Sequence, residues 1–362
     1  MTADGGRTKR EATGIHGTQF YNVELDMATP FRAYGSVQDA GSFRVAVDPR
    51  KGRAIFAPMR WQTAPGGEGS MHAIDPVHPN VVYSHGFYGN FTRSDVTPAG
   101  RGPSTSLGAG GAQIKNIRPP NETGAQRAQW MAPIVISPFD PQTIYAGYQY
   151  VYRSRDRGES WERISEDLTD NNPRQMGLNP WAIPYQTTTQ IAESPLTKGV
   201  IYAGTDDGNL HVTRDDGKTW MNIGKNLPMA LKKWVSRIVP SKYEAGTVFV
   251  AQRGREDDDF APYLWKSADY GATWTSVAGN IPSGSINVIR EDPSVKDVLY
   301  AGNDFGVYVS KDGGQQWDVL GANLPSVEVS DLQIHPRDHL IVISTYGRGM
   351  WVLDARKVRA LK

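Results

Sequence analysis

Short apolar runs separated by polar turns recur along the whole chain, and the long 3.6-residue periodicity of helices is absent. A common unit has an apolar run, an Asp or Pro, a short polar stretch, and a β-branched and aromatic run that often ends in Tyr-Ala-Gly. It occurs seven times, at 26–34, 75–83, 138–145, 195–202, 240–249, 293–300 and 336–344. The units start 43 to 63 residues apart, near the ~40–50 residues of a four-stranded propeller blade. The pattern therefore predicts an all-β, seven-bladed β-propeller.

The expected blades follow the seven units and form a single domain over 1–362. Their approximate bounds are 18–65, 70–118, 130–165, 186–223, 234–278, 285–320 and 328–355. The last blade supplies only three strands, and we expect residues 1–14 to add the fourth and close the ring, because closure removes exposed sheet edges. The chain opens inside a repeat motif, so we also expect a signal or upstream domain to precede it.

A second repeat, Ser/Thr-x-Asp-x-Gly-x-x-Trp, lies between the third and fourth strands of a blade. It occurs at 154–161, 213–220, 267–274 and 310–317, and in degenerate form at 2–9, where Lys9 replaces Trp. Asp and Ser/Thr side chains accept backbone N–H groups in tight turns, Gly tolerates positive φ, and Trp buries a large ring. We therefore expect a structural role for Asp4, Asp156, Asp215, Asp269, Asp312, Trp161, Trp220, Trp274 and Trp317.

Composition excludes several classes of function. The 362 residues carry 39 basic and 38 acidic side chains, and 39% of residues are hydrophobic. Balanced charge argues against nucleic acid as a partner, and no apolar run approaches the roughly 18 residues of a membrane span. With no cysteine there is no disulfide, thiolate ligand or thiol nucleophile. Histidine spacing suggests no metal, and no cofactor motif is present.

The second repeat resembles the Asp-box, or bacterial neuraminidase repeat, of sialidases, sortilin-type receptors, two-propeller xyloglucanases and photosystem assembly factors. The segments 20–42, 193–208 and Tyr346-Gly-Arg-Gly-Met-Trp-Val-Leu-Asp354 resemble bacterial BNR-repeat glycosyl hydrolase, sortilin-like proteins. This resemblance implies the C-terminal one of two propellers, a secreted or periplasmic setting, and a second propeller or a protein as partner. It indicates fold more strongly than activity.

Candidate site residues gather on the rim opposite the Asp-box turns. Carboxylates there are Asp39, Glu68, Asp206, Asp258 and Asp304, and candidate substrate-binding residues are Tyr88, Tyr148, Trp181, Arg253, Tyr346 and Arg348. Aromatic rings suit sugar faces, and paired donors and acceptors suit sugar hydroxyls. Glycoside hydrolysis uses two carboxylates roughly 5 to 9.5 Å apart. The plainer interpretation is a solvated polar rim with Asp in tight turns.

Two functions therefore remain open. The first is a glycan-binding or glycoside-hydrolase-like propeller with a carbohydrate ligand on this rim. The second is a non-catalytic protein-interaction propeller similar to sortilin or the photosystem assembly factors. A sialidase ranks low, because the required Arg-Ile-Pro element has its nearest match at Arg237-Ile-Val-Pro240 in the fifth unit, where we expect Arg237 to be an ordinary strand residue.

Overall fold

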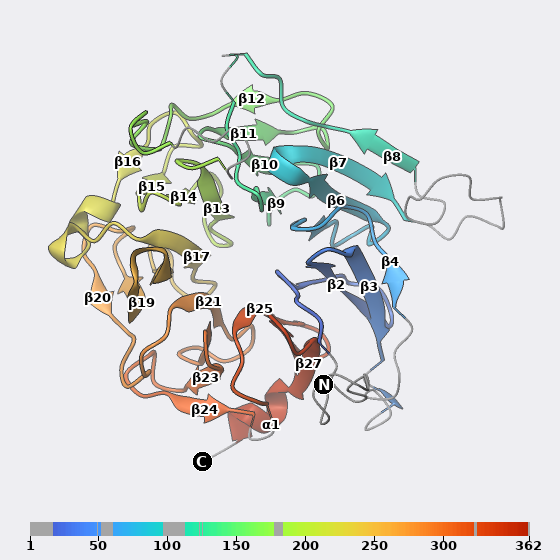
Figure 1. Cartoon of the computed structure of the whole chain (residues 1–362), viewed down its shortest axis with the longest axis vertical. Coiled ribbons are helices and arrows are strands. Elements are labelled where there is room, and N and C mark those ends of the chain that lie inside the picture. Colours follow the sequence, from blue (N-terminus) through green and yellow to red (C-terminus); the bar gives the residue numbers. More distant parts are fainter. Residues whose placement is uncertain are drawn as a thin grey trace, which may run out of the picture.

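Seven antiparallel sheets stand around a central axis in a computed structural model of the chain (Figure 1). The structure describes residues 17–48, 50–51, 61–96, 113–122, 124, 126–176, 184–321 and 324–360. Six sheets have four strands and the seventh has three, in sequential order. The predicted seven-bladed all-β propeller is confirmed. The expected closing strand at 1–14, with Asp4, lies outside the described residues.

Each blade begins at the axis and runs outward. The first three blades comprise β1 (Glu24–Leu25), β2 (Phe31–Val37), β3 (Gly41–Val47) and β4 (Gln62–Thr63); β5 (Ala73–Ile74), β6 (Val81–Gly86), β7 (Asn90–Asp95) and β8 (Gln113–Asn116); and β9 (Ile134–Ile136), β10 (Ile144–Gly147), β11 (Val151–Ser154) and β12 (Glu162–Arg163).

The other four blades continue around the ring. They comprise β13 (Thr188–Glu193), β14 (Ile201–Thr205), β15 (Leu210–Thr213) and β16 (Met221–Asn222); β17 (Trp234–Pro240), β18 (Val248–Gly254), β19 (Asp259–Ser267) and β20 (Thr275–Ser276); β21 (Ile286–Glu291), β22 (Leu299–Asn303), β23 (Val307–Ser310) and β24 (Asp318–Leu320); and β25 (Val329–Ile334), β26 (Leu340–Thr345) and β27 (Met350–Asp354), followed by helix α1 (Ala355–Ala360). Short 3-10 turns are η2 (Phe87–Gly89), η3 (Gly224–Asn226), η4 (Pro228–Ala230) and η5 (Arg255–Asp257). No helix in the described ranges is both long and apolar enough for a membrane span.

The hydrophobic core lies between neighbouring blades. Tyr202 and Val212 of the fourth blade pack with Val250 of the fifth, for example. The glycine of the Tyr-Ala-Gly run makes this packing possible, because a Cβ at Gly204 would collide with the side chain of Val235 on the next inner strand. Gly302 stands in the same relation to Val329. The repeated sequence therefore encodes the close approach of one blade to the next.

The described start of the chain joins the last blade to the first. Phe20 N–H donates to Thr345 O at 3.1 Å, and Tyr21 N–H donates to Ser36 O at 3.0 Å. Beneath this link, Leu340 and Val342 of the seventh blade pack with Phe31 of the first. Contacts on both sides thus close the ring within the described residues.

The four Ser/Thr-x-Asp-x-Gly-x-x-Trp turns have one geometry. The Ser or Thr hydroxyl donates to Asp Oδ1 at 2.7–2.8 Å and accepts the Gly N–H at 2.7–2.9 Å. Asp Oδ1 also accepts a backbone N–H four residues on, at 2.8–3.0 Å. Each indole N–H donates to a carbonyl of the preceding blade, for example Trp161 to Ile117 O at 2.8 Å. These turns therefore fasten blades together.

The aspartates of these turns are held by local hydrogen bonds. In Asp156 the Ser160 hydroxyl, followed by backbone N–H donors, lowers the carboxyl pKa to about 2, because hydrogen bonds to the charged form favour it. In Asp215 the Thr219 hydroxyl has the same effect. The oxygens of these two aspartates thus accept hydrogen bonds from their own turns.

Candidate functional site

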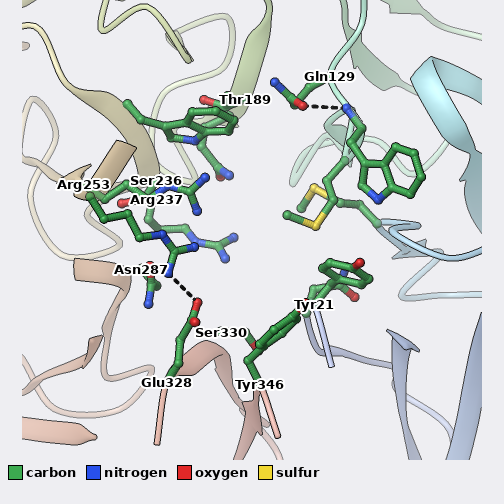
Figure 2. A pocket seen from close by; sticks show the side chains of 17 residues that line it. Tyr21, Gln129, Thr189, Ser236, Arg237, Arg253, Asn287, Glu328, Ser330 and Tyr346 are labelled. Carbon is green, nitrogen blue, oxygen red and sulfur yellow. Dashed lines mark hydrogen bonds and ion pairs between the residues drawn. The ribbon is translucent and has the colours of Figure 1, made fainter. Parts of the chain in front are cut away.

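A cavity of about 360 Å³ opens at the axis, on the rim opposite those turns (Figure 2). Its walls come from the start of the inner strands, the ends of their neighbours, and the connections between blades. Aromatic rings, guanidinium groups, amides and hydroxyls all line it. Its volume falls in the range typical of small-ligand sites.

A repeated β-bulge supplies part of the polar lining. In four consecutive blades the register of the inner strand shifts at its start, leaving one residue unpaired. These residues are Thr189, Ser236, Asn287 and Ser330, and all four line the cavity. A bulge re-aims a side chain out of the regular alternation of a strand. The fold thus places polar groups around the axis at one level.

Three of the four bulge residues also bind the next blade. Thr189 Oγ1 donates to Val235 O at 2.7 Å, Ser236 Oγ donates to Ile286 O at 2.6 Å, and Asn287 Nδ2 donates to Val329 O at 3.2 Å. The bulge residues therefore join the inner strands of the fourth to seventh blades by hydrogen bonds, and they also line the cavity.

The aromatic lining comes from Tyr21, Trp130, Trp234 and Tyr346. Tyr21 and Tyr346 lie with ring centroids 5.9 Å apart, and the Tyr21 hydroxyl donates to Glu68 Oε1 at 2.9 Å. Burial and the Glu68 contact raise the pKa of Tyr21 above its usual value, so its hydroxyl stays protonated at neutral pH. These two rings form one side of the cavity (Figure 2).

Trp130 forms another side and is held from behind. Its ring stacks on Phe87 at a centroid distance of 4.1 Å, and its backbone N–H donates to Gln129 Oε1 at 2.8 Å. The indole lies against Gly69, where φ is +67° and any Cβ would collide with the ring. Glycine at this position therefore serves both the turn and the placement of Trp130.

Guanidinium groups of Arg237, Arg253 and Arg255 complete the lining. Arg253 lies over the ring of its cross-strand partner Trp234, with 4.2 Å between the guanidinium carbon and the ring centroid. Arg255 Nη1 lies 2.8 Å from Glu328 Oε1 and 3.3 Å from Asp304 Oδ1. Glu328 is the one carboxylate among the described residues that line the cavity.

The five candidate carboxylates are not brought together in the cavity. Glu68 and Asp304 lie behind it and bind the lining residues Tyr21 and Arg255. Asp39 and Asp258 are exposed turn residues with φ of 58° and 56°. The structure thus spreads these carboxylates around the rim.

Asp206 is hydrogen-bonded to Gln129, which lines the cavity. Its Oδ2 accepts the Gln129 amide at 2.8 Å and the Thr187 hydroxyl at 2.7 Å, and its Oδ1 accepts Thr187 N–H at 2.8 Å. Burial raises the pKa of Asp206 to about 6. The carboxyl group orients an amide that lines the cavity and does not itself line it.

The candidate substrate-binding residues divide similarly. Arg253 and Tyr346 line the cavity, and Tyr88 lies beside it, 5.6 Å from the Trp130 ring. Tyr148 is buried and its hydroxyl donates to Gly89 O at 2.5 Å, so it presents no surface to a ligand. Arg348 is exposed and away from the lining, and Trp181 lies outside the described residues.

Sequence reasoning missed most of the lining. Trp130, Trp234 and Tyr21 belong to no repeat. Arg237 lies on strand β17 as expected, and it also lines the cavity, which was not expected. A usable signal existed, because a polar residue stands at the same place near the start of the inner run in four blades, at Thr189, Ser236, Asn287 and Ser330.

Comparisons with known proteins place the chain among β-propellers of several functions. No family model matches it. It is 24% identical over 304 residues to a probable oligoxyloglucan-reducing end-specific xyloglucanase of Neosartorya fischeri, covering 70% of this chain and 34% of that protein. It is 27% identical over 128 residues to the vacuolar protein sorting/targeting protein 10 of Arthroderma gypseum, covering 32% of this chain and 8% of that protein. The chain thus spans about a third or less of these curated relatives.

Solved structures give the same picture at lower identity. The GH74 xyloglucanase of Xanthomonas campestris superposes with a TM-score of 0.65 at 17% identity, over 95% of this chain and 53% of that one. YCF48 of Cyanidioschyzon merolae superposes with a TM-score of 0.61 at 9% identity, over 94% of this chain and 96% of that one. Another YCF48 structure holds a D1 peptide, with a TM-score of 0.58 at 11% identity over 94% of this chain and 93% of that one. Such likeness shows the fold alone.

Proposed function

We propose that the chain binds an oligosaccharide or polysaccharide in the axial cavity. One observation carries the proposal: aromatic rings of Tyr21, Trp130, Trp234 and Tyr346 line the same cavity as amide, hydroxyl and guanidinium groups. Apolar faces pack on aromatic rings, and hydroxyl groups need buried donors and acceptors at hydrogen-bonding distance. The likeness to xyloglucanases supports a glycan ligand without identifying it.

Binding, and not hydrolysis, is the function that this lining supports best. Hydrolysis usually needs two carboxyl groups within range of one glycosidic bond. Among the described residues, Glu328 carries the one carboxyl group that lines the cavity, and it is ion-paired with Arg255. The other carboxyl group would therefore have to come from a domain facing this rim. We expect this chain by itself to bind without releasing reducing ends.

A panel of soluble and insoluble polysaccharides tests the proposal, with binding measured by calorimetry or affinity electrophoresis. Trp234→Ala should weaken binding of the best ligand at least tenfold, because truncation of a central aromatic residue commonly costs about 2 kcal/mol or more. Phe139→Ala is the control, since Phe139 is 41% exposed in the β9–β10 turn on the other rim. No binding to any polysaccharide, or equal binding by Trp234→Ala, would contradict the proposal.

A peptide ligand is the second candidate, favoured by one part of the cavity. Met71 and Met131 line it next to Trp130, and Phe87 stacks behind Trp130 with 38% of its surface exposed. Flexible methionine side chains adapt to apolar peptide side chains. The YCF48 structure bound to a D1 peptide supports this candidate as a comparison of fold. A peptide library in the same assay decides between the two.

A further inference from the structure

Three arginines line one cavity, and each of them has a carboxylate partner on one part of its guanidinium group. Arg237 comes from β17, Arg253 from the end of β18, and Arg255 from η5. Figure 2 shows Arg237 and Arg253 among the lining residues. Only 11% of the Arg237 side chain and 15% of the Arg253 side chain are exposed. Buried guanidinium groups need acceptors, because an uncompensated charge in a protein interior is costly.

Arg253 is held in place but left with free donors. Its Nε lies 2.8 Å from Glu256 Oε1, and its planar group lies on Trp234. Among the described residues, Nε is buried without a hydrogen bond of good geometry, and the two terminal nitrogens have no hydrogen-bond or ion-pair partner. Burial lowers the pKa of Arg253 to about 10 in spite of Glu256. The fixed fork is thus pre-oriented for a planar, two-oxygen acceptor.

Arg237 shares its counter-ion with another arginine. Asp331 Oδ1 lies 2.9 Å from Arg237 Nη2 and 3.1 Å from Arg290 Nη2, and it also accepts the Leu332 N–H at 2.8 Å. Asp331 therefore faces two buried guanidinium groups, and Glu24, whose carboxyl pKa burial raises to about 7, is a further acidic group near both arginines. Arg255 differs, because Glu328 and Asp304 both approach its Nη1. Arg255 thus has two carboxylate oxygens at a terminal nitrogen, whereas Arg253 has its carboxylate partner at Nε.

We propose that the sugar bound in the cavity is acidic, carrying a carboxylate as a uronic acid does, and that Arg253 with Arg237 holds this carboxylate. The inference rests on the proposed function. Trp234 would then hold the Arg253 fork, while Trp130 and the tyrosines on the other sides contact the sugar rings. Charge-assisted contacts to a planar carboxylate are the strong interactions here, and the rings add contact area.

Chemical reduction of uronic acids to the matching neutral sugars tests the proposal, because it changes only the carboxyl group of the ligand. Polysaccharides rich in uronic acid, such as pectate, alginate and glucuronoxylan, are measured before and after carboxyl reduction, beside neutral xyloglucan and galactan. We expect an acidic polymer to bind best, its reduced form to bind about 10- to 100-fold more weakly, and added salt to weaken only the acidic form.

Matched variants separate this proposal from the proposed function. Arg253→Gln should abolish the preference for the acidic form but keep weak binding of the reduced form, and Arg253→Lys should restore part of it. Arg214→Gln is the control, because Arg214 lies 4.1 Å over the Tyr270 ring outside the cavity. If neutral polymers bind as well as acidic ones, or Arg253→Gln changes nothing, the carboxylate site is overturned while glycan binding stands. If only peptides bind, or nothing binds, both proposals fail.

Discussion

The two rims of the ring use polar side chains in opposite ways. On one rim, four turns repeat the same Ser/Thr, Asp, Gly and Trp contacts, and their polar atoms bind their own backbone or the preceding blade. On the other rim, side chains differ from blade to blade, as Trp130, Arg253 and Tyr346 do, and they meet at one cavity. Repeated residues therefore specify the ring, and beyond the four bulge positions the cavity is lined by residues that do not repeat.

The strongest test of this difference between the rims is to replace one tryptophan on each rim by alanine. Trp317 is 4% exposed, packs in the core between the fifth and sixth blades, and donates to Val277 O at 3.0 Å. Trp317→Ala should lower the free energy of unfolding by about 3–5 kcal/mol through cavity formation. Polysaccharide affinity at a temperature where the variant is folded should change less than twofold.

Trp234→Ala is the counterpart, with a large loss of binding and a small loss of stability. Thermal and denaturant unfolding, followed by calorimetric titration, measure both quantities for both variants. Equal stability of Trp317→Ala and wild type, or equal destabilisation by the two substitutions, would remove the distinction between the rims.

The repeated rim was predictable because its information is local. Asp156, Gly158 and Trp161 lie within eight residues, and the hydrogen bonds of the turn itself follow from that spacing. The number of blades followed from the same periodicity. Even the Gly204 contact with Val235 has a signature, since it recurs as Tyr-Ala-Gly.

The cavity was only partly predictable because it joins residues from distant blades. Tyr21 and Tyr346 are neighbours only because the ring closes, and Arg237 meets Asp331 only across two blades. Two of the residues named from the sequence, Arg253 and Tyr346, line the cavity. Sequence reasoning could not tell that Tyr148 is buried, because this residue lies in the bend after β10, where no strand alternation assigns a face.

Carboxyl groups on the two rims should respond to pH with opposite signs. The pKa of Asp206 is about 6, above its ordinary 3.8, because of burial. Its contribution to stability is thus complete below pH 3.8 and is lost as the pH rises through 6, a change of about 3 kcal/mol at most. The pKa of Asp156 is lowered to about 2, so its contribution is present above pH 3.8 and is lost as the pH falls toward 2.

Unfolding free energies of wild type, Asp206→Asn and Asp156→Asn between pH 2.5 and pH 7.5 test this contrast. Relative to wild type, Asp206→Asn should gain stability as the pH rises from 4 to 7. Asp156→Asn should differ from wild type by a constant amount above pH 4 and converge toward it below. Parallel curves for Asp206→Asn and wild type would mean that Asp206 titrates normally.

The bulge residues give the smallest and most discriminating effect, because they lie on the cavity rim yet make contacts between blades. Ser236→Ala removes the hydroxyl that donates to Ile286 O at 2.6 Å, which should lower the free energy of unfolding by about 0.5–1.5 kcal/mol. Ser330→Ala is the matched control, since Ser330 Oγ bonds Ser344 Oγ at 2.9 Å within its own blade.

We expect a smaller loss of stability for Ser330→Ala, because strands β25 and β26 are already joined by their backbone ladder. Polysaccharide affinity should change less than threefold in Ser236→Ala, since its hydroxyl is directed at the next blade. A stable Ser236→Ala that loses most of its binding would instead make the bulge a ligand contact. A repeated position would then contribute to ligand binding. The contrast between repeated structural residues and unrepeated ligand-binding residues would hold only for the aromatic and arginine residues.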